Sequence, residues 1–137
     1  MSKGILSSVT VLVVEDEELV RQAIADMLEG IAVGSVVAVE SGATAIEHLS
    51  DEESSIDLVI CDIVMPEMDG FEFVRHLRYG DVPRYKDIPI LVLTGANKPE
   101  YAQRGKYYRI QAFLLKPPDP LMLRRHMLRA LGRDAGG

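Results

Sequence analysis

The sequence contains little of what secreted, membrane-spanning or disulfide-stabilised proteins require. It has no tryptophan, and Cys61 is its only cysteine, which excludes an internal disulfide and any metal site made of cysteines alone. No apolar run approaches the roughly 20 residues that cross a bilayer, and the first residues lack the charged and then apolar pattern of a secretion signal. We therefore expect a cytoplasmic protein without membrane segments, with Cys61 as a small core side chain.

An excess of positive charge is also missing. The chain has 15 Lys and Arg against 21 Asp and Glu, which gives a formal net charge of -6. With this balance there is no general basic field for a phosphate backbone, so we predict no direct binding of nucleic acid.

Repeats, low-complexity tracts and internal linkers are absent from the 137 residues as well. This predicts a single domain over residues 1–131. Residues 132–137 are rich in glycine and read as a flexible tail, or as a linker stub that leads to a fused output domain.

Five apolar runs rich in Val, Ile and Leu stand out: Val9–Val14, Val33–Val39, Ile56–Cys61, Ile88–Leu93 and Ala112–Leu115. They do not alternate with polar residues, which is typical of strands buried on both faces. Segments with helical periodicity separate them, for example the one that contains Leu19, Ala23 and Met27. Repeated alternation of strand and helix in one small domain predicts an α/β fold, a doubly wound parallel sheet with helices on both faces.

Polar side chains follow four of the five runs. Glu15 and Asp16 come after the first run, Asp62 after the third, Thr94 after the fourth and Lys116 after the fifth. Because ligands of such sheets bind outside the carboxyl ends of the strands, we expect these side chains to converge. Each of them alone has a plainer interpretation, as a helix cap, a strand end or a solvated charge, and only their joint placement indicates a site.

Three carboxylates this close need a cation, because two of them about 4 Å apart repel by about 4 kcal/mol at an effective dielectric constant of about 20. Oxygen donors without His or Cys suit a hard ion, and we predict Mg2+, with Mn2+ as a substitute. A metal-bound carboxylate beside an amine and a hydroxyl is what in-line phosphoryl transfer requires. Asp62 follows the middle buried run and is the natural nucleophile, with Glu15 and Asp16 as ion ligands.

Four segments of the chain resemble the receiver domain of two-component response regulators: VLVVEDE, LVICDIVMPEMDGFEFVRHLR, ILVLTGA and AFLLKP. The resemblance implies a flavodoxin-like fold of five parallel strands, in the order 2-1-3-4-5, with five helices. It also implies a domain that accepts a phosphoryl group from a histidine kinase or phosphotransfer protein in a Mg2+-dependent reaction. Such a domain phosphorylates and dephosphorylates itself rather than turning over a substrate as a conventional enzyme does.

The resemblance assigns roles to the residues that hold the ion. Asp62 is the phospho-acceptor and, with Asp16, a direct ligand of the ion. Glu15 holds the ion partly through water, and the main-chain carbonyl of Val64 completes the protein ligands.

The resemblance also implies a switch. Thr94 and Lys116 sense the phosphoryl oxygens, and Phe113 stands in the place of the family's switching aromatic residue. Phosphorylation draws Thr94 inward, Phe113 turns into the space, and the face formed by the fourth helix, the fifth strand and the fifth helix changes. Signalling is then a population shift between two packings.

Several positions depart from the usual pattern of the family, among them Phe113, Val64 and Ala96. Phe113 has no hydroxyl where Tyr is frequent, which removes one hydrogen bond from an inward ring. Val64 and Ala96 are apolar at two positions that influence how water reaches the phospho-aspartate. Because neither side chain can orient an attacking water, we predict slow self-hydrolysis.

The partner surface is open between two interpretations. The segment from Lys98 to Ile110 contains three tyrosines, and the last helix carries arginines at four-residue spacing. These side chains either form a partner face or lie solvated on a short, shifted fourth helix and an ordinary polar fifth one. The candidate partner-face residues are Tyr101, Tyr107, Tyr108, Arg125 and Arg129. A downstream protein target and a homodimer through the fourth-helix face are further expectations.

Two other functions fit parts of the pattern. A pseudo-receiver would share the fold and act as a constitutive protein-interaction module, although every acceptor-site residue is present. A phosphohydrolase of the haloacid dehalogenase type also combines a nucleophilic Asp with Thr, Lys and further acids. That chemistry needs a second Asp two residues after the nucleophile, where this chain has Val64. We rank both below the phosphoryl acceptor.

Overall fold

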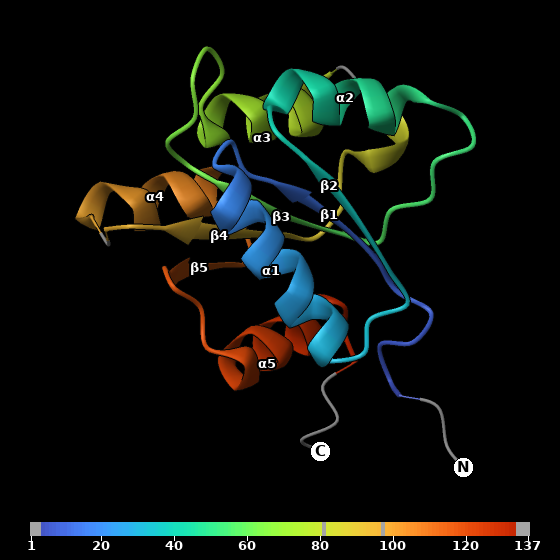
Figure 1. Ribbon diagram of the computed structural model, residues 1–137. Coiled ribbons are helices and arrows are strands. Elements are labelled where there is room, and N and C mark those ends of the chain that lie inside the picture. Colours follow the sequence, from blue (N-terminus) through green and yellow to red (C-terminus); the bar gives the residue numbers. More distant parts are fainter. Residues whose placement is uncertain (1–3, 81, 97, 134–137) are drawn as a thin grey trace.

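The computed structural model describes residues 4–80, 82–96 and 98–133. The strands are β1 (Thr10–Val14), β2 (Ser35–Val39), β3 (Leu58–Asp62), β4 (Ile90–Thr94) and β5 (Ala112–Leu115). The helices are α1 (Glu18–Gly30), α2 (Gly42–Ser50), α3 (Gly70–Tyr79), α4 (Pro99–Tyr107) and α5 (Pro120–Ala130), with a 3-10 turn η1 (Pro83–Tyr85). All strand pairings are parallel, in the order β2-β1-β3-β4-β5, so the predicted doubly wound sheet is confirmed (Figure 1).

The sheet lies between two layers of helices (Figure 1). α1 and α5 cover one face, where Ile24 and Met127 are buried against the strands. α2, α3 and α4 cover the other face, where Phe71 and Phe73 are among the largest fully buried side chains. No helix in the described part of the chain is long and apolar enough to cross a membrane.

The central strands β1, β3 and β4 are almost wholly buried, as the unbroken apolar runs predict. Alternate side chains enter the two cores, with Val59 and Cys61 on one side of β3 and Leu58 and Ile60 on the other. The prediction of burial on both faces is wrong for β2 and β5, because they are the edge strands and keep exposed positions.

Cys61 is the expected core side chain, and burial raises the pKa of its thiol to about 12.

In α1 the buried face is not the face that the periodic pattern suggested. The spacing of Leu19, Ala23 and Met27 correctly predicts a helix, but Leu19 is 85% exposed. The buried residues are Ile24 and Leu28, one position further along the same period. A four-residue spacing therefore identifies a helix without identifying its packed face when two neighbouring rows are both apolar.

The end of α5 bears on the tail predicted for residues 132–137. Gly132 takes a left-handed φ of 69° after the helix, and the Arg133 amide donates to the Leu128 carbonyl at 2.7 Å. These two residues form a helix-ending turn, and the tail over residues 132–137 stays a prediction. Residues 134–137 lie outside the described residues.

Arg78 is a buried cation that ties three segments together. It is 4% exposed, and its guanidinium donates to four main-chain carbonyls over 2.8–3.0 Å, those of Lys86, Ile88, Tyr108 and Arg109. These bonds join α3 to the loop before β4 and to the turn after α4. Burial lowers the pKa of Arg78 to about 10, which leaves it charged at neutral pH.

We expect Arg78→Lys to destabilise the protein, because one ammonium cannot reach carbonyls that a planar, five-donor fork satisfies. Each buried carbonyl left without a donor costs about 1–3 kcal/mol, so the free energy of unfolding in urea should fall by about 2 kcal/mol or more. Arg75→Lys is the matched control, since Arg75 is exposed on the same helix. Equal urea midpoints for the two variants would show that Arg78 does not hold these segments together.

Candidate functional site

The polar residues that were predicted to converge lie at the carboxyl edge of the sheet. Glu15 and Asp16 follow β1 directly, Asp62 is the last residue of β3, Thr94 is the last residue of β4, and Lys116 follows β5. Oxygens of the Glu15, Asp16 and Asp62 carboxylates all lie within 4.8 Å of one another. The predicted acidic cluster is therefore present.

Lys116 connects this cluster to the far edge of the sheet. Its Nζ donates to Glu15 Oε1 at 2.6 Å and to Asp62 Oδ2 at 2.8 Å. Glu15 and Asp62 are 1% and 6% exposed, so both ion pairs are shielded from water on their acidic side. The interpretation of Lys116 as a solvated surface charge is excluded, because its ammonium is a partner of two buried carboxylates.

The cluster holds more negative charge than one ammonium balances. Burial raises the pKa of Glu15 above its usual value, although the hydrogen bond from Lys116 offsets part of this effect. Burial would lower the pKa of Lys116, but its hydrogen bonds to Asp62 and Glu15 raise the pKa above the usual value instead. Three carboxylates and one ammonium therefore leave a net negative site that favours an added cation.

The donor set fits Mg2+. It consists of carboxylate oxygens alone, and the Asp16 carboxylate accepts no hydrogen bond from any described residue, so its oxygens are available to a ligand. A hard ion with few protein ligands and several waters suits such a partly open site. The side chain of Val64 is 74% exposed, and the role of its carbonyl as a ligand stays a prediction.

Two residues that shape the site were missed by the sequence reasoning. Arg21, on α1, donates to the carbonyls of Glu15 and Asp16 at 2.9 and 3.4 Å and so holds the acidic turn. Gly70, at the start of α3, lies directly beside the Asp62 carbonyl, which a Cβ would overlap. The Asp69-Gly70 pair reads as turn chemistry in the sequence, and only the packed structure shows that Gly70 is required for close approach.

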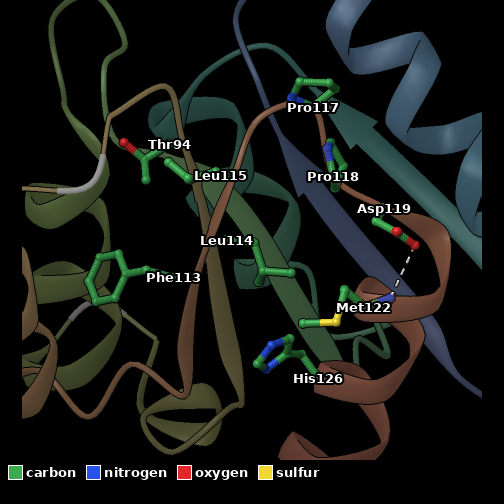
Figure 2. Close-up of a pocket in the computed structure, with 9 residues that line it drawn as sticks. All are labelled: Thr94, Phe113, Leu114, Leu115, Pro117, Pro118, Asp119, Met122 and His126. Atoms are coloured by element: carbon green, nitrogen blue, oxygen red, sulfur yellow. Dashed lines mark hydrogen bonds between the residues drawn. The ribbon is translucent and has the colours of Figure 1, made fainter.

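Thr94 is buried beside the cluster but is bonded to its own loop. Its hydroxyl donates to the Ala96 carbonyl at 2.8 Å and accepts from the Ala96 amide at 3.2 Å. In this conformation the hydroxyl therefore has its partners on the loop after β4, and Lys116 has its partners on the carboxylates. Figure 2 shows Thr94 at one end of a groove that continues along β5.

A family model for the response regulator receiver domain matches residues 11–127 of the chain. The chain belongs to this family. The match takes in the five strands except for Thr10, the first residue of β1, together with every residue of the acidic edge. Family membership therefore covers the site as well as the fold. Receiver domains accept phosphoryl groups, generally with Mg2+, and interact with histidine kinases or phosphotransfer proteins.

Individual relatives agree with this assignment. The chain is 32% identical over 121 residues to the two-component response regulator ORR5 of Oryza sativa, covering 88% of this chain and 87% of that protein. It is 37% identical over 127 residues to a probable cyclic di-GMP phosphodiesterase of Vibrio cholerae. The aligned region covers 91% of this chain but only 27% of that protein. The chemotaxis protein CheY4 of Vibrio cholerae has a similar structure, with a TM-score of 0.80 and 33% identity over 90% of this chain and 99% of that one.

The ring of Phe113, the predicted switching residue, is packed beneath α4. The Phe113 ring is half-buried, stacks on Tyr101 with 6.1 Å between ring centres and an angle of 13°, and lies 6.2 Å from Phe71. It rests against Gly105, where α4 has no side chain. The phosphorylation-driven inward turn implied by the resemblance is therefore not needed to bring this ring against α4.

The candidate partner-face residues separate into two groups. Tyr101 is 9% exposed and belongs to the core beside Phe113, because its ring fills the space between α4 and the sheet. Tyr107 is 69% exposed, Tyr108 is half-buried, and Arg125 and Arg129 are exposed on α5. The segment does form the short helix that was one of the two interpretations, but not all of its rings lie on the surface.

Gly105→Ala tests how closely Phe113 and α4 are packed. In an ordinary helix interior this change stabilises by about 0.5–1 kcal/mol, because glycine loses more conformational freedom on folding. Here the new Cβ would overlap Phe113 Cε2, so we expect a lower free energy of unfolding in urea.

The control for this prediction is the same substitution in a Phe113→Leu background, which lacks the ring atom that Cβ meets. There Gly105→Ala should be neutral or stabilising. Equal stabilisation in both backgrounds would contradict the close packing of this glycine and this ring.

Proposed function

We propose that this receiver domain accepts a phosphoryl group on Asp62 from a histidine kinase or phosphotransfer protein, with Mg2+ held by Glu15, Asp16, Asp62 and the Val64 carbonyl. The observation that carries the proposal is the placement of Asp62 between the acidic cluster and the Lys116 ammonium. No other carboxylate in the described part of the chain ends a central strand at this edge.

Asp62 is suited to act as the nucleophile. Its Oδ1 accepts from the Ile63 amide at 2.7 Å and its Oδ2 accepts from Lys116, which fixes the plane of the carboxylate. In the transfer an Asp62 oxygen forms a bond to phosphorus while the bond between phosphorus and the donor's histidine nitrogen breaks. The imidazole leaves with that electron pair, and Lys116 stabilises charge on the phosphoryl oxygens. Mg2+, when bound, neutralises negative charge on the carboxylates and the phosphoryl group.

Transfer changes the partners of Thr94 and Lys116. A phosphoryl group on Asp62 places new acceptor oxygens beside the ammonium and the end of β4. Thr94 then exchanges its bond to the Ala96 carbonyl for one to a phosphoryl oxygen, which moves the loop between β4 and α4. The face of α4, β5 and α5 responds, including the groove of about 340 Å³ beside Thr94 and Phe113 in Figure 2.

Intact-mass spectrometry after incubation with Mg2+ and a small phosphodonor tests the acceptor. We expect the native chain to gain one phosphoryl group that hydroxylamine removes, and Asp62→Asn to gain none. Glu67→Gln is the matched control, because Glu67 is an exposed carboxylate in the loop after Asp62 and should leave the gain intact. A gain retained by Asp62→Asn, or its absence from folded, Mg2+-binding native protein under donation by a histidine kinase, would overturn the proposal and favour a pseudo-receiver.

The apolar side chains at Val64 and Ala96 predict a phosphoryl lifetime of minutes or longer. Neither can hydrogen-bond a water in line with the phospho-aspartate, and Val64 is 74% exposed, so a polar side chain there would reach water without disturbing the core. We expect Val64→Asn to shorten the lifetime, measured as loss of the phosphoryl mass with time. A native lifetime of seconds would contradict this account.

A further inference from the structure

Three tyrosine rings meet on the surface between the ends of α3 and α4. The centre of the Tyr79 ring lies 6.5 Å from that of Tyr107 and 6.3 Å from that of Tyr108, and the last two lie 5.0 Å apart. Tyr79 and Tyr107 are 57% and 69% exposed, while Tyr108 is half-buried. We call Tyr79, Tyr107 and Tyr108 the tyrosine patch. It takes no part in the phosphoryl transfer proposed above.

The helix ends that carry the tyrosine patch are held together by the buried Arg78. Arg78, the residue before Tyr79, donates to the carbonyl of Tyr108 at 2.8 Å and to that of Arg109 at 3.0 Å. The ends of the two helices that carry the rings are thus held together by a buried guanidinium. Rings held in this way lose little conformational freedom when a partner binds, which lowers the cost of association.

Exposed basic side chains lie next to the tyrosine patch along the chain. Nine of the 15 Lys and Arg lie in residues 98–133, which contain only two of the 21 Asp and Glu. Next to the rings along the chain are Arg75, one helical turn before Tyr79, and Lys106 and Arg109, which flank the other two tyrosines; all three are exposed. Within the described residues only Arg109 of these three is ion-paired, with Asp87 at 3.0 Å.

We propose that the tyrosine patch binds a partner protein through an acidic segment that carries apolar side chains. Tyrosine and arginine are enriched among the residues that contribute most of the binding energy of protein interfaces, because they combine large apolar area with hydrogen-bond donors. The exposed rings supply the apolar contact, and the cations around them attract carboxylates. This surface is distinct from the groove between β5 and α5, which is lined by Phe113, Met122 and His126 rather than by these tyrosines.

Two other occupants fit the observations less well. Single-stranded nucleic acid stacks on open ring faces, but Tyr107 and Tyr108 stand edge to face at 83° and Tyr79 meets Tyr108 at 63°, so the rings do not form a flat stacking platform. The net charge of -6 also repels a polyanion. A two-fold dimer through this surface would place the same cations against one another, which disfavours a second copy.

The experiment is an amide chemical-shift titration of the isotope-labelled full chain, in the unphosphorylated state, with a short helical peptide of Glu and Leu. A peptide with Lys in place of every Glu serves as the matched probe. We expect the acidic peptide, but not the basic one, to bind and to shift the amide signals of Tyr79, Tyr107 and their neighbours. Because this titration involves no phosphoryl group, its outcome is independent of whether Asp62 is the acceptor.

Variants assign the binding to individual side chains. Tyr79→Ser with Tyr107→Ser should weaken binding of the acidic peptide by about tenfold or more, and Arg75→Glu with Lys106→Glu should weaken it to a similar degree. The second pair leaves every ring in place, so it remains informative if the serine variant is unstable. Met122→Ser is the matched control, since it removes an exposed apolar side chain from the groove beside α5 and should have no effect.

Four outcomes would overturn the proposal. The first two are that the acidic peptide does not bind, or that both peptides bind equally. The third is that amide shifts map to residues of the β5 groove and disappear in Met122→Ser. The fourth is that the protein self-associates with concentration and the tyrosine variants abolish this association. The third would assign the partner to the groove, and the last would assign the tyrosine patch to a second copy of the chain.

Discussion

The site depends on one interaction, the pair of hydrogen bonds from the Lys116 ammonium to the carboxylates of Glu15 and Asp62. These bonds join the end of β5 to the ends of β1 and β3, across the full width of the acidic edge. Without an ammonium, two buried carboxylates and the nearby Asp16 would repel one another at short range. With it, the cluster is held together but keeps a net negative charge. The same arrangement therefore holds the three strand ends together, leaves a net charge that favours an added cation, and orients the proposed acceptor Asp62.

A change at the acidic edge can reach the surface through Thr94, the loop after β4 and α4. Thr94 ends β4, which pairs with the strand that ends in Asp62, and its hydroxyl bonds the loop that leads into α4. α4 packs on the sheet through Tyr101 and Gly105, both in contact with Phe113, and its far end is fixed to α3 by Arg78. The helix is thus held along its length by Phe113 and beyond its end by Arg78. A shift at its beginning changes the packing of Phe113 on one side and the surroundings of the tyrosine patch on the other.

The sequence predicted the parallel sheet and the acidic edge because these follow from strong local signals: apolar runs, helical periods and polar residues just after strands. The order of the strands came instead from the resemblance to receiver domains. The burial of Tyr101 and the exposure of Leu19 were not predictable in this way, since each depends on which side of a helix meets its neighbours. The role of Arg78 was not predictable from the sequence. Its partners are main-chain carbonyls, so no acidic residue in the sequence marks them. Gly70 and Gly105 were visible as glycines, but the atoms that a side chain would overlap come from elsewhere in the chain.

The most direct measurement is urea unfolding of the native chain and of Asp16→Asn, each with and without Mg2+. A cation that binds only the folded acidic cluster stabilises it by mass action, so Mg2+ should raise the native unfolding midpoint. Asp16→Asn removes one carboxylate from a repulsive cluster. We therefore predict a higher midpoint than native in the absence of Mg2+ and little further rise when Mg2+ is added. A native midpoint that Mg2+ leaves unchanged, or an equal rise in both proteins, would contradict an acidic edge built to hold a cation beside Asp62.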